Sequence, residues 1–203
     1  MPAGDAGGGF LPDRHPDRLR WNARYAGGFT PSFAPHPLAV RALALDLPPG
    51  PVADLACGPS GSALLAAANG RPVTAVDISE VALGMLSDQA RRQGLVTLIT
   101  PVHADLTAWR PRPRSYALVL CTGFWDRDVF AAAAGAVAHG GMLGWEAFTM
   151  AALRTRPGLC PGWCLGDGEP ASLLPAGFAV LDQHDLPDRD SGTRRQLLAR
   201  RQD

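Results

Sequence analysis

A glycine-rich turn follows the first of several short apolar runs in the sequence. The run at 52–56 leads into the segment Asp54-Leu55-Ala56-Cys57-Gly58-Pro59-Ser60-Gly61. Glycines in such a turn let backbone amides approach a ligand closely, and a helix that follows the turn offers free N–H groups to a carboxylate or a phosphate. The turn therefore predicts a ligand contact made through the backbone, although a tight connection between a strand and a helix has the same pattern.

Acidic residues follow the next two apolar runs. Asp77 comes about 20 residues after the turn, where a carboxylate can accept hydrogen bonds from both hydroxyls of a ribose. Asp105, within His103-Ala104-Asp105-Leu106, can accept from the exocyclic amine of an adenine, with Leu106 against the ring. Together the two acids predict an adenosine site. The alternative is structural: Asp77 as a helix N-cap and Asp105 as a cap or turn residue.

The elements that must position these residues alternate between strand and helix, which is typical of a doubly wound parallel sheet with helices on both faces. The expected strands cover 52–56, 73–76, 98–102, 116–121 and 142–148. The expected helices cover 38–45, 62–68, 79–93 and 129–139. The last two strands, 178–183 and 195–199, are separated by a polar loop at 185–193 and should form an antiparallel hairpin at the sheet edge. Ligands of such sheets bind at the carboxyl ends of the strands.

Length and composition narrow the class of protein. The chain has 203 residues and is 46% hydrophobic, which suits one globular domain. Its formal net charge of +0 disfavours a nucleic-acid partner. The sequence has no apolar run long enough for a membrane span and no secretory leader, so we expect a cytoplasmic protein. All basic residues are Arg, which excludes lysine-dependent chemistry. Residues 1–20 are expected to be a flexible segment that precedes a domain at 21–203, with a short helical turn at 20–25.

The four cysteines do not indicate a disulfide framework or a metal site. Cys160 and Cys164 form a C-x3-C pair with no second pair at zinc-site spacing. We expect reduced cysteines and no bound metal.

These segments together resemble class I S-adenosylmethionine-dependent methyltransferases. The resemblance covers roughly Trp21 to the C-terminus and is carried by 52–58, 76–79, 104–106, 116–121 and 140–143. It implies one Rossmann-like domain whose mostly parallel seven-stranded sheet has the order 3-2-1-4-5-7-6, with an antiparallel edge hairpin. Two segments resemble the small tellurite-resistance and thiopurine methyltransferases: Trp21-Asn22-Ala23-Arg24-Tyr25 and Trp145-Glu146-Ala147-Phe148-Thr149.

The resemblance also implies a cofactor, S-adenosyl-L-methionine, and the residues around it. The turn departs from the family's Asp-x-Gly-x-Gly-x-Gly, because Ala56 and Ser60 replace its first and third glycines. Ala56 adds a methyl group where the methionine moiety should pass, and Ser60 adds a hydroxyl that can bond a carboxylate. Arg24 is a candidate for the cofactor carboxylate or else a solvated surface residue. The cofactor-binding candidates are Arg24, Asp54, Ala56, Cys57, Gly58, Ser60, Gly61, Asp77, Ile78, Asp105, Leu106, Cys121 and Thr122.

The sequence is less informative about the site of the methyl acceptor. The segment 157–163 and the N-terminal lid should help to form the pocket, but the aromatic residues there can equally be core residues. No catalytic residue is assigned; the base candidates are Glu146, Asp126 and His36. The fourth strand is not followed by Asn/Asp-Pro-Pro-Tyr, which disfavours nucleobase and glutamine acceptors. The pocket candidates are Tyr25, Phe124, Trp125, Glu146 and Trp163.

We therefore expect methyl transfer to sulfur, oxygen, nitrogen or a metalloid of a small molecule, by a monomer or a homodimer. Two alternatives remain. One is a partner protein that binds S-adenosylmethionine or S-adenosylhomocysteine without catalysis. The other is an NAD(P)-dependent oxidoreductase of Rossmann type, disfavoured because the turn is not G-x-G-x-x-G and because of the terminal hairpin.

Overall fold

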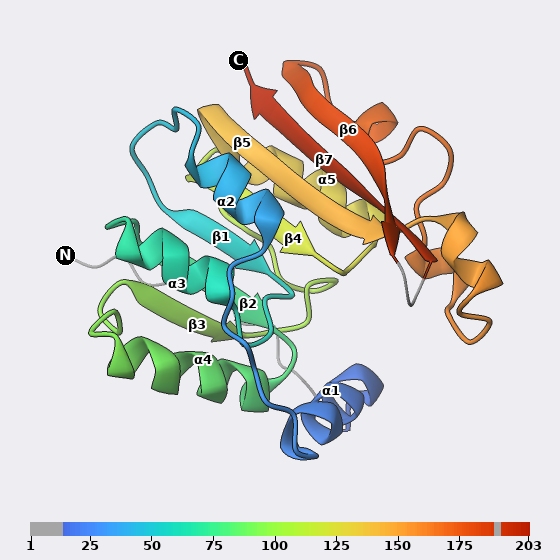
Figure 1. Cartoon of the computed structure of the whole chain (residues 1–203). Coiled ribbons are helices and arrows are strands. Elements are labelled where there is room, and N and C mark those ends of the chain that lie inside the picture. Colours follow the sequence, from blue (N-terminus) through green and yellow to red (C-terminus); the bar gives the residue numbers. More distant parts are fainter. Residues whose placement is uncertain (1–13, 189–191) are drawn as a thin grey trace.

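A seven-stranded sheet of order β3-β2-β1-β4-β5-β7-β6 organises the chain in the computed structural model, which describes residues 14–188 and 192–203 (Figure 1). The first five strands in this order are parallel, and β7 runs antiparallel to both β5 and β6. The fold and the strand order expected from the sequence are confirmed. The strands are β1 Val52–Leu55, β2 Val73–Asp77, β3 Ile99–His103, β4 Tyr116–Thr122, β5 Val137–Phe148, β6 Phe178–Asp188 and β7 Gly192–Arg201.

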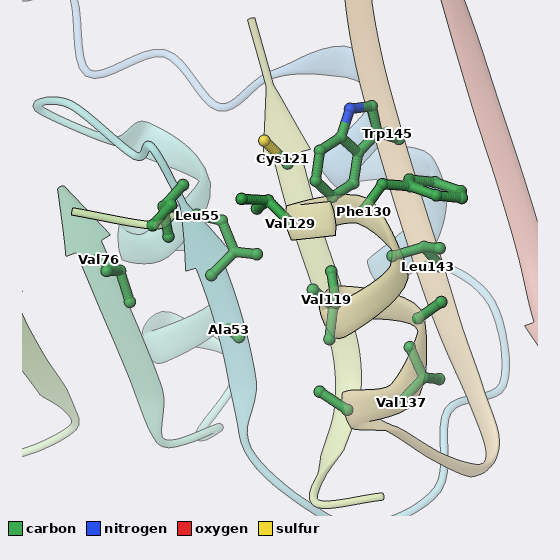
Figure 2. Packing of buried hydrophobic residues seen from close by; sticks show 14 of the residues in the cluster. Ala53, Leu55, Val76, Val119, Cys121, Val129, Phe130, Val137, Leu143 and Trp145 are labelled. Atoms are coloured by element: carbon green, nitrogen blue, oxygen red, sulfur yellow. The ribbon is translucent and has the colours of Figure 1, made fainter. Parts of the chain in front are cut away.

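Helices cover both faces of this sheet. The α-helices are α1 Pro16–Ala26, α2 Pro37–Leu43, α3 Gly61–Ala68, α4 Glu80–Arg92 and α5 Arg127–Ala136. Three short 3-10 helices are η1 Met150–Arg154, η2 Pro161–Trp163 and η3 Ala171–Leu173. Helices α2, α3 and α4 share one apolar core with the sheet, and α5 lies against the other face (Figures 1 and 2). Because side chains alternate along a strand, Ala53 and Leu55 face α5 whereas Val52 faces α3.

The core beside α5 is aromatic. Phe130 of α5 and Trp145 of β5 meet edge to face (Figure 2), with ring centroids 5.1 Å apart. The Trp125 ring packs against both. The indole Nε1 of Trp145 donates to the Phe124 carbonyl at 3.0 Å, so the buried polar atom of this ring is satisfied. This cluster fixes the carboxyl ends of β4 and β5 relative to α5.

The expected boundary between α5 and β5 is wrong. Helix α5 ends at Ala136 and β5 begins at Val137, whereas the sequence suggested a helix to 139 and a strand from 142. The β-branched Val137 takes up an extended backbone, φ −66 and ψ 129, at the helix end. The carbonyls of Gly135 and Ala136 accept from Arg114 and Ser115, which draws the chain into the sheet.

The two ends of the domain also differ from the expectation. The boundary at residue 20 falls inside α1, which begins with Pro16 at the first helical turn, where a missing backbone N–H costs nothing. The rest of the expected flexible segment, residues 1–13, lies outside the described residues. At the other end, β6 and β7 extend into the predicted polar loop 185–193. The side chain of Arg195 donates to Asp185 across the hairpin, so polar residues here are strand residues held by cross-strand pairs.

All four cysteines are free thiols. Within 14–188 and 192–203, no three His, Cys, Asp or Glu side chains are grouped to hold a metal ion. Over the same residues, no helix has the length and apolar character needed to cross a membrane.

Candidate functional site

The carboxyl ends of the parallel strands bring the predicted site segments to one edge of the sheet. Leu55 of β1 pairs with Val76 of β2 and with Cys121 of β4. Farther along the edge, Asp77 pairs with His103, and Thr122 pairs with Glu146 of β5. The turn after β1, the acid of β2, the loop after β3 and the ends of β4 and β5 are therefore neighbours.

The turn after β1 is held from inside by a buried hydrogen bond. The Ser60 hydroxyl donates to Asp54 at 2.5 Å and accepts from the Ala63 amide at 3.0 Å, so Ser60 is also the N-cap of α3. Burial raises the pKa of Asp54 from 3.8 to about 6, although the Ser60 hydrogen bond opposes this. Ala56 has the left-handed φ of 49 at the position where the related family has glycine.

Asp77 ties this turn to the start of α4. Its Oδ2 accepts from the Gly58 amide at 2.7 Å, and its Oδ1 accepts from the Ser79 amide at 2.8 Å. Burial raises the pKa of Asp77, partly offset by these hydrogen bonds. Each carboxylate oxygen has a second lone pair, so the group can still accept from two hydroxyls. The structural and the ligand-binding interpretations of Asp77 are thus compatible.

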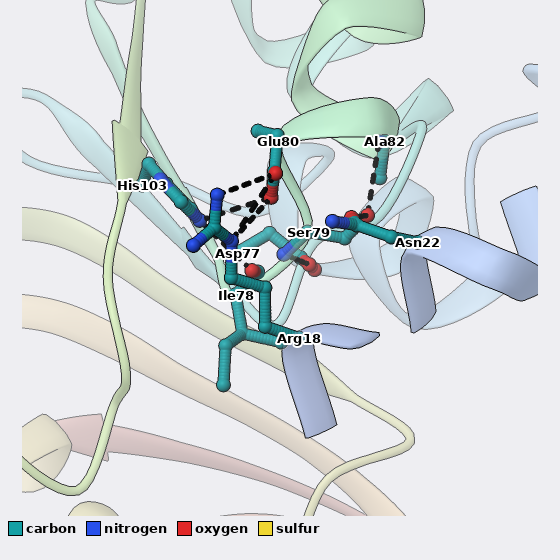
Figure 3. Close-up of polar contacts among 8 residues, drawn as sticks. All are labelled: Arg18, Asn22, Asp77, Ile78, Ser79, Glu80, Ala82 and His103. Atoms are coloured by element: carbon teal, nitrogen blue, oxygen red, sulfur yellow. Dashed lines mark hydrogen bonds and ion pairs between the residues drawn. The ribbon is translucent and has the colours of Figure 1, made fainter. Parts of the chain in front are cut away.

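Helix α1 covers this part of the edge through a polar stripe (Figure 3). Arg18, Asn22 and Tyr25 follow the spacing of one helix face. Arg18 Nη2 donates to Glu80 at 2.7 Å, and Asn22 Oδ1 accepts from the Ser79 hydroxyl at 2.7 Å. The hydrogen bond from Arg18 holds the pKa of Glu80 at about 2.

Arg18, Asn22 and Glu80 were not predicted as site residues from the sequence. The helical spacing of residues 18, 22 and 25 within a polar segment was the available signal, but it does not indicate which surface these residues contact.

Tyr25 lies directly over the glycine turn. Its hydroxyl is 2.9 Å from the point that a Cβ at Gly58 would occupy, and Gly58 itself has φ 57. Burial, together with the nearby Asp77, raises the pKa of the Tyr25 phenol to about 12. A glycine at 58 therefore serves both the left-handed turn and the close approach of the Tyr25 ring.

Residues 27–36 form a strap that runs from α1 across the start of α3 (Figure 1). A Cβ at Gly61 would overlap the backbone of Phe33 and Ala34, so glycine is needed there for the passage of the strap. The His36 amide donates to Ser62 Oγ at 3.0 Å, which anchors the end of the strap. Gly61, which was predicted as a cofactor contact, therefore lies against the backbone of the strap.

The loop after β3 places Asp105 beside the N-terminal helix. Asp105 accepts from the Thr107 amide at 2.9 Å and from the Thr107 hydroxyl at 2.6 Å, which is the turn role considered for it. His15 Nε2 lies 3.6 Å from Asp105, and His15 Nδ1 is buried without a hydrogen-bond partner in the described part of the chain. Leu106 packs in the core around α5.

The remaining cofactor candidates differ in exposure. Ile78 and Thr122 are half-buried, while Cys57 and Cys121 carry thiols whose pKa burial raises well above the usual value. The Cys121 side chain lies wholly within the core around α5 (Figure 2). Arg24 is exposed on α1, and its guanidinium lies 5.5 Å from the Trp21 ring centroid.

The aromatic residues predicted to line an acceptor pocket divide into two groups. Trp125 is only 3% exposed and belongs to the core with Phe130 and Trp145, which disfavours a place in a pocket wall. Trp163 is 40% exposed, and the Arg20 guanidinium lies 5.0 Å from its ring centroid, which links α1 to the η2 segment. Phe124 is half-buried at the end of β4.

Two of the base candidates have structural partners that limit a proton-transfer role. Asp126 caps α5 by accepting from the Asp128 and Val129 amides, both at 2.9 Å. His36 Nδ1 accepts from the Leu38 amide at 3.2 Å, and its Nε2 lies 3.2 Å from Glu146. This pattern assigns the proton to Nε2, so the neutral imidazole has no free acceptor nitrogen.

Glu146 is buried but fixed in its charged form. It accepts from Arg194 Nη1 at 2.9 Å and from Gln196 Nε2 at 2.7 Å, in addition to the contact with His36. Burial alone would raise its pKa, but these hydrogen bonds more than offset it and hold the pKa at about 2. A carboxylate this acidic is a poor base near neutral pH.

Comparisons with known proteins place the fold. Residues 52–141 match the family model described as a methyltransferase domain. No curated protein sequence matches the chain at a significant level. A chain solved under the heading "Conversion of a Disulfide Bond into a Thioacetal Group during Echinomycin Biosynthesis" is 22% identical, covers 91% of this chain and 93% of itself, and has a TM-score of 0.64.

Two methyltransferases are similar in structure at lower identity. Haemonchus contortus phosphoethanolamine N-methyltransferase 2, solved with S-adenosylhomocysteine, has a TM-score of 0.66 at 12% identity, over 81% of this chain and 52% of that one. Geranyl diphosphate C-methyltransferase from Streptomyces coelicolor A3(2), solved with Mg²⁺, geranyl diphosphate and S-adenosyl-L-homocysteine, has a TM-score of 0.66 at 14% identity, over 81% and 75%.

The chain thus has the fold seen in class I S-adenosylmethionine-dependent methyltransferases, and residues 52–141 within it match the methyltransferase-domain model. Because 897 solved chains match this fold, the architecture alone selects no acceptor.

Proposed function

We propose that the protein transfers a methyl group from S-adenosylmethionine to a small-molecule acceptor. The observation that carries the proposal is Asp77, which ends β2 beside the glycine turn and retains two lone pairs while it accepts from Gly58 and Ser79. The family-model match over residues 52–141 supports the same conclusion. When bound, the cofactor supplies a methyl group on a sulfonium, which an acceptor lone pair displaces in line as S-adenosylhomocysteine leaves.

The residues present fit this cofactor. Asp77 would hold the ribose hydroxyls, with Ile78 against the adenine. His15 Nδ1, buried and without a partner among the described residues beside Asp105, offers a polar atom near the proposed adenine position. The turn from Asp54 to Gly61 would flank the methionine moiety, and Thr122 at the end of β4 would lie near the sulfonium.

Charge supports the fit at the methionine end. Burial raises the pKa of both Asp54 and Asp77, and the negative charge of Asp77 raises the pKa of Asp54 further. A ligand with an ammonium and a sulfonium group would relieve that cost by adding positive charge. Arg24 remains a candidate for the cofactor carboxylate, since its only described side-chain contacts are with the Trp21 and Phe29 rings.

Helix α1 and the strap would enclose the bound cofactor. No residue of α1 is fully buried, and Arg18 and Asn22 contact the domain through hydrogen bonds. Polar contacts of this kind can be exchanged for water at little cost, so α1 can leave the edge to admit ligands and return to exclude water.

We infer that the acceptor provides its own nucleophile. Asp126, His36 and Glu146 are each engaged in a way that disfavours proton removal. Thiolates and other anionic nucleophiles need no base, and alignment with the methyl group can supply much of the rate. The resemblance of 21–25 and 145–149 to tellurite-resistance and thiopurine methyltransferases supports a small acceptor of this kind.

A second candidate is a protein that binds the cofactor without catalysis. The observation that favours it is Ala56, whose methyl group stands at φ 49 where the related family has glycine. Methyl transfer from labelled cofactor to a panel of thiols, selenite, tellurite and phenols separates the two. Product with any acceptor excludes the non-catalytic candidate, and no product with the whole panel favours it.

The cofactor proposal is tested by S-adenosylhomocysteine binding to the wild type and to Asp77→Ala. Loss of charged hydrogen bonds should weaken binding by about 10-fold or more. Asp88→Ala, at an exposed position of α4, is the matched control and should bind like the wild type. An unchanged dissociation constant in Asp77→Ala, with the variant still folded, would restrict Asp77 to its structural role.

A further inference from the structure

Two guanidinium groups meet at one aromatic ring beside the proposed acceptor side. Phe148 is the last residue of β5, two positions beyond Glu146, which pairs with Thr122 at the end of β4. The guanidinium carbon of Arg194, on β7, lies 4.5 Å from the Phe148 ring centroid. That of Arg156, between η1 and η2, lies 4.7 Å from the same centroid. Both distances are within the range of a cation–π contact.

The two arginines differ in how their charge is balanced. Arg194 donates to Glu146, so a buried carboxylate offsets its charge. For Arg156, the contact with Phe148 is the only side-chain interaction within 14–188 and 192–203. Its guanidinium therefore keeps a net positive charge and its hydrogen-bond donors at the carboxyl edge of the sheet.

No described side chain around Arg156 supplies a compensating acid. The segment 149–165, which carries Arg156, contains Arg154 as its other charged residue and no Asp or Glu. On the facing strand, Arg195 is paired with Asp185. The neighbouring Glu169 is paired with Arg127. No described side chain therefore balances the charge of Arg156, which is available to a bound ligand.

We propose that the methyl acceptor carries an anionic group, a carboxylate or a phosphate, which binds Arg156 beside Phe148. This inference rests on the proposed methyl transfer and names its substrate class. A guanidinium over a ring directs N–H donors outward in a fork that matches two anion oxygens. The Phe148 ring holds the Arg156 guanidinium in place. Arg156 is a specificity residue, because it binds the anionic end of the acceptor and not the reacting atom.

The test uses three small probes of similar shape on protein saturated with S-adenosylhomocysteine. Benzoate and phenyl phosphate carry the two kinds of anion, and benzamide is the neutral counterpart of benzoate. Calorimetric titration or ligand-observed NMR gives the dissociation constants. We expect at least one anion to bind about 5-fold or more tightly than benzamide, on the scale of a charged hydrogen bond. The tighter of the two identifies the kind of anion.

Arg156→Gln should remove this preference and leave benzamide binding unchanged. Arg154→Gln, an exposed neighbour on the same segment, is the matched control and should retain the preference. Equal binding of all three probes to the wild type, undetectable binding of both anions, or a preference that survives Arg156→Gln would overturn the inference. Binding of S-adenosylhomocysteine itself is measured first, so a failure of the cofactor proposal is seen separately from a failure of the acceptor proposal.

Discussion

The substitution Asp54→Asn should stabilise the protein at neutral pH. Asp54 is 3% exposed, and burial raises its pKa from 3.8 to about 6. Between about pH 4 and pH 6 the folded state therefore binds more protons at this site than the unfolded chain. The contribution of Asp54 to the free energy of unfolding falls as pH rises through this window and remains low above it.

The magnitude follows from the size of the pKa shift. A rise of about 2 pH units corresponds to about 3 kcal/mol, at about 1.36 kcal/mol per unit. Asn has nearly the same shape, and its side-chain oxygen can still accept from the Ser60 hydroxyl. We expect Asp54→Asn to match the wild type near pH 4 and to be more stable by about 1–3 kcal/mol at pH 7.5. Its affinity for S-adenosylhomocysteine should fall, because the ligand's ammonium loses a nearby negative charge.

Urea unfolding at the two pH values measures this difference directly. Effects of other titrating groups are common to both proteins and cancel in the comparison. Asp88→Asn, at an exposed position on α4, should change stability by less than about 0.5 kcal/mol at either pH. A variant less stable than the wild type at pH 7.5, or a stability gap that is the same at both pH values, would refute the reasoning.

Three further substitutions test the packing around the site. Gly61→Ala should destabilise the domain by more than about 2 kcal/mol, because the added methyl group meets the strap backbone. Gly84→Ala, in open space on α4, is the control and should stabilise the domain by about 0.5–1 kcal/mol. Equal effects of the two substitutions in urea unfolding would disprove the strap contact. Trp145→Ala should cost about 3–5 kcal/mol, and a loss below about 1 kcal/mol would contradict its place in the core. Glu146→Gln should lower the free energy of unfolding by about 1–3 kcal/mol at pH 7, because the new side-chain amide group would face hydrogen-bond donors. This loss should shrink as pH falls from about 4.5 towards 2, where the wild-type carboxylate becomes protonated. A loss that is constant with pH would show that the charge of Glu146 is not involved.

The order of the sheet could be predicted from sequence because its signals are local and repeated. Apolar runs such as 52–55 and 73–76 fall between glycine turns and helix caps, and the chain has few other ways to bury them. The edge where Asp77 and Thr122 lie follows from the parallel arrangement of the strands. The edge that brings the candidate site residues together was therefore predictable once the strands were known.

The partners of individual side chains were not predictable in the same way. Trp125 precedes a helix in a polar context, and only the tertiary packing of Phe130 and Trp145 shows that it is a core residue. The stripe of α1 that contacts Glu80, and the strap over Gly61, join segments far apart in the sequence. Such contacts depend on the fold as a whole, so no local pattern encodes them.

Both proposals require that the carboxyl edge of this sheet binds S-adenosylmethionine. Calorimetric titration of the wild-type protein with S-adenosylhomocysteine and, in parallel, with NADH tests it most directly. We expect saturable binding of S-adenosylhomocysteine at one site per chain and no comparable binding of NADH. Tight binding of NADH with no response to S-adenosylhomocysteine would contradict it.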